Sequence, residues 1–291
     1  MNVDYQNQTM EHLRRLAADD EPFFLEYWPL YPLTGPRTTT DQYTTPNGGV
    51  YVEKMKLVDQ WIGELMAEMD RLGVADNTLV VIMGDNGHFT KYSPQSGYTP
   101  MIFRGGKGST YEGGVRVDAF VRWPGMIEAD SVVGDIVHVS DLFTTIARFA
   151  GATDEIPTDR VIDGIDQSTL MFEGETNGRR DYVFLYNIDT LEAAIKEQYK
   201  LKLPGSIKNA ILADFYDLNR DTREQYPVST EIGAWGGAKF VRMVMRHMKR
   251  KAKYPDEGPA TGMPYDGIEN LRPESKAAVE EFLFMMRTPG M

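Results

Sequence analysis

The fold depends on the stretch Thr78-Leu79-Val80-Val81-Ile82-Met83, which is followed at once by Gly84-Asp85-Asn86-Gly87-His88. The first of these segments is an apolar run, and such a run is typical of a strand that is covered on both faces, as in a parallel sheet. Apolar residues recur at helical spacing from Val52 to Leu72, and Gly73 is well placed to end that helix. A helix that leads into a buried strand predicts an α/β sandwich.

The same patterns predict further elements along the chain. Helices are predicted over 9–18, 141–150 (capped by Ser140), 240–251 and 275–286. Buried strands are predicted over 22–28 and 119–123, and short strands separated by turns over 182–186, 200–203 and 211–216. We therefore expect two parts. An α/β core would occupy residues 1–163, and a small antiparallel sheet with terminal helices would occupy residues 164–291.

Composition and charge exclude several classes of partner. The 291 residues include 31 Lys and Arg against 43 Asp and Glu, for a net charge of −12. Such an acidic chain does not favour nucleic acid or anionic membrane surfaces. No stretch approaches the roughly 18 apolar residues that a membrane span requires. The chain has no cysteine, which excludes disulfides, thiolate metal ligands and a cysteine-derived nucleophile.

A polar turn follows the apolar run at the point where a ligand site is expected. Ligands of open α/β sheets bind beyond the carboxyl ends of the strands. Asp85 and Asn86 would present two oxygen ligands there, which suits a hard cation such as Ca²⁺ or Mg²⁺. The same residue types are common in ordinary turns, so the motif by itself leaves both interpretations open.

A glycine-rich segment follows about twenty residues later, over 105–117. Its glycines allow the backbone to approach a ligand closely. Lys107 would supply a positive charge for an anion such as a sulfate or phosphate ester. A surface loop with a solvated lysine is the alternative.

Together, in this order and at this spacing, the two motifs resemble those of the sulfatase family of the alkaline phosphatase superfamily. The second motif reads Gly106-Lys107-Gly108-Ser109-Thr110-Tyr111-Glu112-Gly113-Gly114. Four further segments are similar to family patterns, so that the resemblance covers roughly residues 10–225: Pro22–Leu25, Val139–Ile146, Asp163–Asp166 and Asp214–Asp221. The resemblance implies an alkaline-phosphatase-like sandwich with a mixed, mostly parallel sheet flanked by helices, plus a small C-terminal antiparallel subdomain.

The resemblance also implies roles for individual residues. Asp85 and Asn86 would be metal ligands, for Ca²⁺ in preference to Mg²⁺. Lys107 would be the catalytic and substrate-binding residue, in contact with the sulfate group and its bridging oxygen. His88 is a further substrate-binding candidate, with a hydrogen-bonded loop histidine as the alternative. The substrate would be a small-molecule or glycan sulfate ester. Two residues would support the loop without reacting: Glu112 and Arg116.

Two departures from the family pattern shape the expected activity. The Pro-His-x-Pro loop of the family is Pro29-Leu30-Tyr31-Pro32 here, and Leu30 can donate neither a hydrogen bond nor a proton. No segment matches the Cys/Ser-x-Pro-x-Arg motif, whose Cys or Ser becomes the formylglycine nucleophile in the family. We therefore expect that the N-terminal part of the core is missing, and that the chain associates with such a segment or with itself.

Three functions remain open at this point. The first is a sulfuric ester hydrolase, and the motifs favour it. The second is a phosphodiesterase or phosphonate hydrolase of the same superfamily. The third is a non-catalytic, truncated paralogue that binds an anion or a partner, an interpretation that Leu30 and the unmatched nucleophile motif support.

Overall fold

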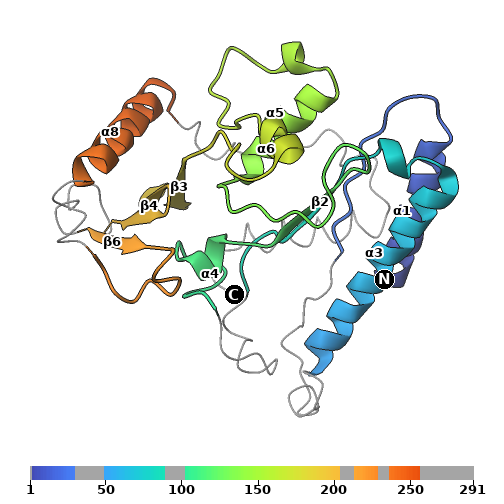
Figure 1. Ribbon diagram of the computed structural model, residues 1–291, viewed down its shortest axis with the longest axis horizontal. Helices are drawn as coiled ribbons and strands as arrows, with labels where there is room; N and C mark the ends of the chain where they lie inside the picture. Colours follow the sequence, from blue (N-terminus) through green and yellow to red (C-terminus); the bar gives the residue numbers. More distant parts are fainter. Residues whose placement is uncertain (1, 30–48, 89–101, 204–212, 229–235, 256–291) are drawn as a thin grey trace, which may run out of the picture. The chain divides into compact units, whose positions relative to one another are not determined.

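The computed structural model describes residues 2–29, 49–88, 102–203, 213–228 and 236–255 (Figure 1). The predicted helix over 275–286 and the Leu30 loop lie outside these residues. The chain divides into two compact units, Met1–Val244 and Met245–Met291. The division predicted near residue 164 is not tested by this partition and stays a prediction. No helix in the described part of the chain is long and apolar enough to cross a bilayer.

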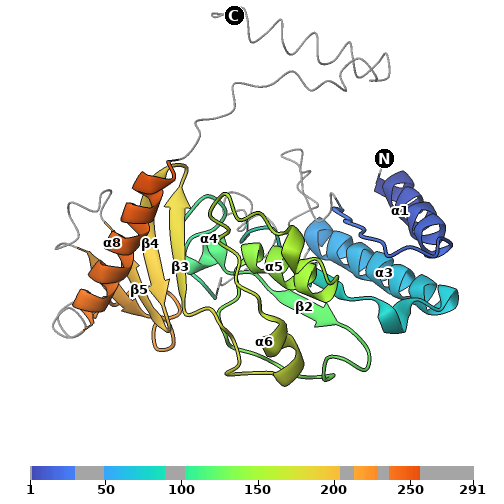
Figure 2. The ribbon, with the colours of Figure 1, turned by 90° about the horizontal axis from the view of Figure 1, so that it is seen from above.

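Two N-terminal helices lie side by side and enclose the first core cluster (Figures 1 and 2). Helix α1 spans Asn2–Ala17 and α3 spans Gly49–Leu72, so the second starts a few residues before its predicted limit. Leu13 of α1 and Met69 of α3 are both buried and belong to this cluster. Gly73 ends α3 in the left-handed conformation, with φ of 72°, as its position predicted.

The segment 22–29 belongs to no helix or sheet, so the prediction of a buried strand over 22–28 is wrong. Its side chains alternate in exposure. Phe23 and Leu25 pack on the α1–α3 cluster, whereas Phe24 and Trp28 are 68% and 69% exposed. The apolar composition misled about this segment, because no described strand pairs with it and its side chains are alternately covered and exposed.

Two short strands form the sheet that leads into the predicted metal motif. The 3₁₀ turn η1 (Ala75–Asn77) precedes β1 (Val80–Met83), which pairs antiparallel with β2 (Ala119–Arg122). The parallel pairing expected for this stretch is therefore not found among the described strands. Burial of β1 on both faces is also not observed, since its first three residues are half-buried and Met83 is exposed. The helix α4 (Glu112–Val115) lies in the glycine-rich segment 105–117.

Two helices follow β2. Helix α5 spans Val139–Phe149 and is followed by η4 (Thr153–Glu155) and by α6 (Ser168–Glu173), which the sequence patterns had not indicated. The N-cap of α5 is His138, so the prediction that Ser140 caps this helix is wrong. The aromatic rings of Trp123, Phe149 and Phe172 meet between these elements, with centroids 5.1–6.2 Å apart.

A four-stranded antiparallel sheet confirms the predicted C-terminal sheet (Figure 2). Its strands are arranged in chain order: β3 (Tyr182–Asn187), β4 (Thr190–Lys196), β5 (Tyr199–Lys202) and β6 (Asp214–Asp217). Helix α8 (Gly237–Lys253) begins by packing Phe240 edge-on against Phe215, at 5.2 Å between ring centroids. Register pairs Lys200 with Ile195 and Tyr216, so the Lys200 side chain leaves the sheet on the same face as these two core residues.

Candidate functional site

The structure brings the two predicted motifs into direct contact. The turn after β1 carries Asp85, Asn86 and His88, and the glycine-rich segment carries Lys107. The backbone N–H of Lys107 donates to the His88 carbonyl oxygen at 2.7 Å, and that of Gly87 donates to the Gly114 oxygen at 3.0 Å. Motifs that lie about twenty residues apart in the sequence are therefore held together by backbone hydrogen bonds.

Glycines permit this close approach. A Cβ atom added to Gly87 would lie 1.8 Å from the carbonyl oxygen of Gly113, and one added to Gly114 would lie 2.2 Å from that of Ser109. Neither distance is possible for a real side chain, so each position requires glycine. Gly105 and Gly108 have φ values of 79° and 86°, which are also favourable for glycine. The Ser109 hydroxyl oxygen accepts from the Gly106 N–H at 3.2 Å and tightens the turn that contains Lys107.

The candidate metal ligands are two neighbouring oxygen donors. Asp85 is exposed, and one of its oxygens accepts a hydrogen bond from the N–H of Asn86 at 2.9 Å. The Asn86 amide nitrogen donates to the Gly87 carbonyl oxygen at 2.7 Å, which leaves the amide oxygen of Asn86 for a ligand. These groups fit a hard divalent cation in kind. They do not fit it in number, because no group of three or more metal-binding side chains occurs in the described part of the chain.

The far end of the glycine-rich segment is fixed to the C-terminal sheet. Thr110 is buried and donates its hydroxyl to Glu192 at 2.7 Å, while the Lys202 ammonium donates to the same hydroxyl at 2.6 Å. Hydrogen bonds from Thr110 and Asn187 lower the pKa of Glu192. Burial lowers the pKa of Lys202, and the nearby Glu192 carboxylate only partly offsets this effect. Hydrogen bonds to Glu192 and Lys202 therefore attach this segment to the sheet, and no local sequence pattern indicated them.

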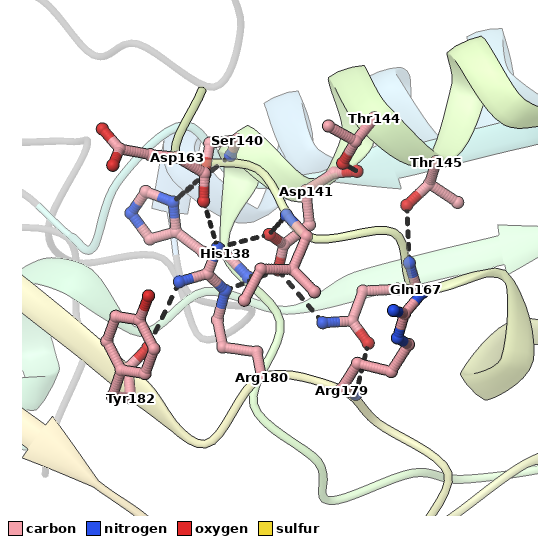
Figure 3. A network of polar contacts seen from close by, with 11 residues as sticks. His138, Ser140, Asp141, Thr144, Thr145, Asp163, Gln167, Arg179, Arg180 and Tyr182 are labelled. Atoms are coloured by element: carbon pink, nitrogen blue, oxygen red, sulfur yellow. Dashed lines mark hydrogen bonds and ion pairs between the residues drawn. The ribbon is translucent and has the colours of Figure 1, made fainter. Parts of the chain in front are cut away.

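A second polar network joins the segments 138–146 and 163–167 to the start of β3 (Figure 3). Asp141 is fully buried and forms a two-pronged ion pair with Arg180, at 2.5 and 2.8 Å. The same carboxylate accepts from the backbone N–H groups of His138 and Ile165 at 2.9 and 2.7 Å. Arg180 also donates to the Asp163 carbonyl oxygen at 2.7 Å. Two segments quoted above for the family resemblance thus meet at one carboxylate.

This network sets the protonation of its members. Burial favours the neutral form of Asp141, yet hydrogen bonds from Arg180 and two backbone N–H groups together lower its pKa. Burial lowers the pKa of His138, and the Arg180 charge acts in the same direction. The neutral imidazole can then accept from the Ser140 N–H, 3.3 Å from its Nδ1 atom. His138 therefore has a structural role at the N-cap of α5.

Comparison with known proteins identifies the family. A sequence model described as Sulfatase matches residues 4–152, which is half of the chain and includes the whole motif region. The chain belongs to the sulfatase family. Among its curated relatives, N-acetylgalactosamine-6-sulfatase from Mus musculus is 34% identical over 275 residues, covering 84% of this chain and 52% of that protein. Steryl-sulfatase from Rattus norvegicus is 40% identical over 142 residues, covering 47% of this chain and 24% of that protein.

A solved structure confirms the fold class. The crystal structure of the PsFucS1 sulfatase from Pseudoalteromonas sp. matches with a TM-score of 0.73 and 26% identity, covering 87% of this chain and 53% of that one. The fold is thus the α/β sulfatase fold of the alkaline phosphatase superfamily, as predicted. The mostly parallel strand order is not observed among the described strands. The chain spans about half the length, or less, of these sulfatases.

Proposed function

We propose that this chain supplies part of the metal and sulfate site of a sulfuric ester hydrolase. In this proposal Asp85 and Asn86 are ligands of a divalent cation, and Lys107 binds the sulfate group. The supporting observation is the pair of backbone hydrogen bonds that join the Asp85–His88 turn to residues 104–114, the Lys107 segment. Because of these bonds, an anion next to Lys107 would lie close to a cation at Asp85.

Lys107 would act through its charge. Hydrolysis of a sulfate ester by water gives an alcohol and inorganic sulfate, and the bond between sulfur and the bridging oxygen breaks. Negative charge grows on that oxygen in the transition state, and an ammonium group at hydrogen-bond distance stabilises it. Lys107 is exposed at the tip of its turn, so its side chain can reach a bound ester. His88, half-buried beside it, is a further candidate for contact with the substrate.

The divalent metal is a family property, and we propose Ca²⁺ rather than Mg²⁺ as its identity here. Bound next to the sulfate, such an ion would supply positive charge to the sulfate oxygens. Ca²⁺ takes six to eight oxygen ligands, and Asp85 and Asn86 offer two. We therefore expect calorimetry to give binding weaker than micromolar for the isolated chain. Micromolar or tighter binding that is lost in Asp85→Ala would show that the site recruits further ligands.

The names of the relatives support sulfate esters as the substrate class. One relative is named for the 6-sulfate of N-acetylgalactosamine and another for steryl sulfates, so the names agree in the sulfate and differ in the alcohol. The substrate of the present protein is accordingly proposed as a sulfate ester of a glycan or of a small molecule. The phosphodiester alternative predicts a preference for phosphate over sulfate at the same lysine.

Titration with inorganic sulfate tests the proposal. We expect Lys107→Ala to weaken sulfate binding at least about tenfold, because a hydrogen bond to a charged group contributes roughly 1.5–3 kcal/mol. Lys56→Ala removes an equal charge from the exposed face of α3 and should change nothing. Phosphate in place of sulfate separates the two hydrolase classes. Sulfate affinity that survives Lys107→Ala would contradict the proposal.

Turnover is a separate readout. The 291 residues contain no Cys, and no Ser in the context of the family's nucleophile, so we expect no hydrolysis of an aryl sulfate by this chain alone with Ca²⁺ or Mg²⁺ added. Hydrolysis that Lys107→Ala abolishes would show that another residue serves as the nucleophile.

A further inference from the structure

A lysine with no exposed surface lies beneath the Lys107 segment. Lys200 of β5 is 0% exposed, and its ammonium nitrogen lies 3.0 Å from Glu112 and 2.9 Å from Glu224. Glu224 is itself 0% exposed, and Glu112 is 5% exposed. Apart from Lys200, nothing in the described part of the chain partners the Oε1 atom of Glu224. Three charged side chains from distant parts of the sequence thus form one buried cluster, the Lys200 cluster (Lys200, Glu112 and Glu224).

Glu224 contacts the Lys107 segment on both sides of Lys107. Its Oε2 atom accepts from the backbone N–H of Glu112 at 2.7 Å, five residues after Lys107. Its backbone carbonyl oxygen accepts from the guanidinium group of Arg104 at 2.7 Å, three residues before Lys107. The Arg104 guanidinium group also lies 4.1 Å from the ring centroid of Tyr111. The span from residue 104 to residue 112 is therefore closed by a single residue far along the chain.

The cluster continues to the metal motif through backbone contacts. Glu112 begins α4, in which Gly113 donates to the Arg104 carbonyl oxygen at 2.7 Å and Gly114 accepts from Gly87 at 3.0 Å. A displacement of Glu112 would therefore move the glycines on which the Asp85–His88 turn rests. A continuous path of short contacts runs from the C-terminal sheet to both proposed ligand-binding segments.

Burial of this cluster is costly for the fold. Burying charges removes them from water, and an apolar replacement of a buried ion pair is often neutral or stabilising. Glu224 also adopts a φ of 51°, a left-handed conformation that a non-glycine residue seldom takes. Two carboxylates share one ammonium group, and the second cation, Arg116, lies 3.8 Å from Glu112 with its side chain 55% exposed. A cluster kept only for stability would be better replaced by apolar side chains.

We propose that Lys200, Glu112 and Glu224 are positioning residues that fix the Lys107 ammonium group relative to the Asp85–His88 turn. The inference rests on the proposed function in one respect, namely that Lys107 binds the sulfate group. None of the three residues touches the substrate. They act through the backbone of residues 104–114, which the cluster ties to β5.

The test compares variants of the full chain by hydrogen exchange and by sulfate titration. Lys200→Met removes the ammonium group that the two buried carboxylates share, and Glu224→Gln is a milder change that removes one charge and keeps one of the two acceptor oxygens. The matched control is Asp141→Asn, which breaks the other buried ion pair, with Arg180, and does not contact the Lys107 segment. We expect all three variants to lower the melting temperature, so loss of stability does not distinguish them.

The distinguishing result is local. We expect amide exchange across residues 104–114 to rise about tenfold in Lys200→Met and less in Glu224→Gln, with Asp141→Asn unchanged there. Sulfate affinity should fall about tenfold in Lys200→Met and remain unchanged in Asp141→Asn. If Lys200→Met does not fold, the amide exchange of Glu224→Gln across residues 104–114 tests the inference in its place.

Exchange across 104–114 that stays the same in the cluster variants, or rises equally in the control, overturns the inference whatever the sulfate result. If sulfate binding by the wild-type chain does not depend on Lys107, the proposed function fails instead. In that case the exchange data still decide whether the cluster fixes the segment.

Discussion

Gly87 is a position in the proposed site where any larger side chain would clash with the backbone. Its α-carbon faces the backbone of Gly113 so closely that a methyl group would lie 1.8 Å from the carbonyl oxygen. We expect Gly87→Ala to destabilise the protein by about 1–3 kcal/mol, as overpacking commonly does, and to separate the two motifs. Urea unfolding and sulfate titration measure the two effects.

Gly63→Ala is the matched control for that change. Nothing lies within 4 Å of a Cβ atom at Gly63, which is in the interior of α3. There the same substitution should raise stability by roughly 0.5–1 kcal/mol, because glycine is a poor helix former. A stability loss of equal size in both variants would contradict the close approach at Gly87.

At this scale the sequence indicated the residues of the proposed site and one residue that supports it, Glu112, but neither Glu224 nor Lys200. Asp85, Asn86 and Lys107 stand in short motifs, so their proximity could be inferred from spacing. Glu224 bonds to Glu112 across 112 residues. A contact of that separation has no local pattern, and the charge of Lys200 argued for exposure, although the side chain is buried.

At the scale of elements, prediction succeeded where the spacing of apolar residues follows the period of a helix or a strand. Helix α3 and the antiparallel strands β3, β5 and β6 were placed within a few residues. Strand β4 was missed because Leu-Glu-Ala-Ala is favourable for a helix, and pairing with two neighbouring strands overrides that preference. Local composition cannot reveal which partners a segment will meet.

The contact between α1 and α3 should depend on pH. Hydrogen bonds from Arg71 and Arg14 lower the pKa of Glu68 from 4.5 to about 2. The charged form is thus favoured by folding, so its contribution to stability is complete above pH 4.5 and is lost as the pH falls towards 2. We expect Glu68→Gln to lower the melting temperature by roughly 2–4 °C at pH 7, with the difference from wild type shrinking between these pH values.

An exposed pair on the same helix provides the control. Glu53 and Lys56 lie 3.5 Å apart with both side chains more than 60% exposed. Glu53→Gln should leave the melting temperature almost unchanged at every pH, since such pairs contribute little. A Glu68→Gln effect that persists undiminished at pH 2 would show that shape, and not charge, determines this contact.

For the molecule as a whole, the exposed aromatic side chains predict association. Phe24, Trp28 and Phe120 are each more than 60% exposed, the first two on the segment 22–29 and the third on β2. Large apolar side chains left in water favour contact with another chain. We expect light scattering to show a mass that rises with concentration, and the double variant Phe24→Ser/Trp28→Ser to reduce it.

Ile188→Ser is the control for association, because Ile188 is 96% exposed at the turn between β3 and β4. If association came from any exposed apolar residue, this variant would reduce it as well. A monodisperse wild-type monomer with a sharp, cooperative melt would contradict this prediction, because the chain would then be stable without a partner.

The ion pair between Asp141 and Arg180 also limits how this protein could be divided or recombined. It crosses the boundary proposed at residue 164, and each side chain is at most 5% exposed. A gene cut at that point would yield one product with a carboxylate and another with a guanidinium group, each of which had lost its buried partner. The C-terminal sheet is therefore not an exchangeable module. A chimera that borrows it from a relative would need to inherit a matching acid and base on both sides of the joint.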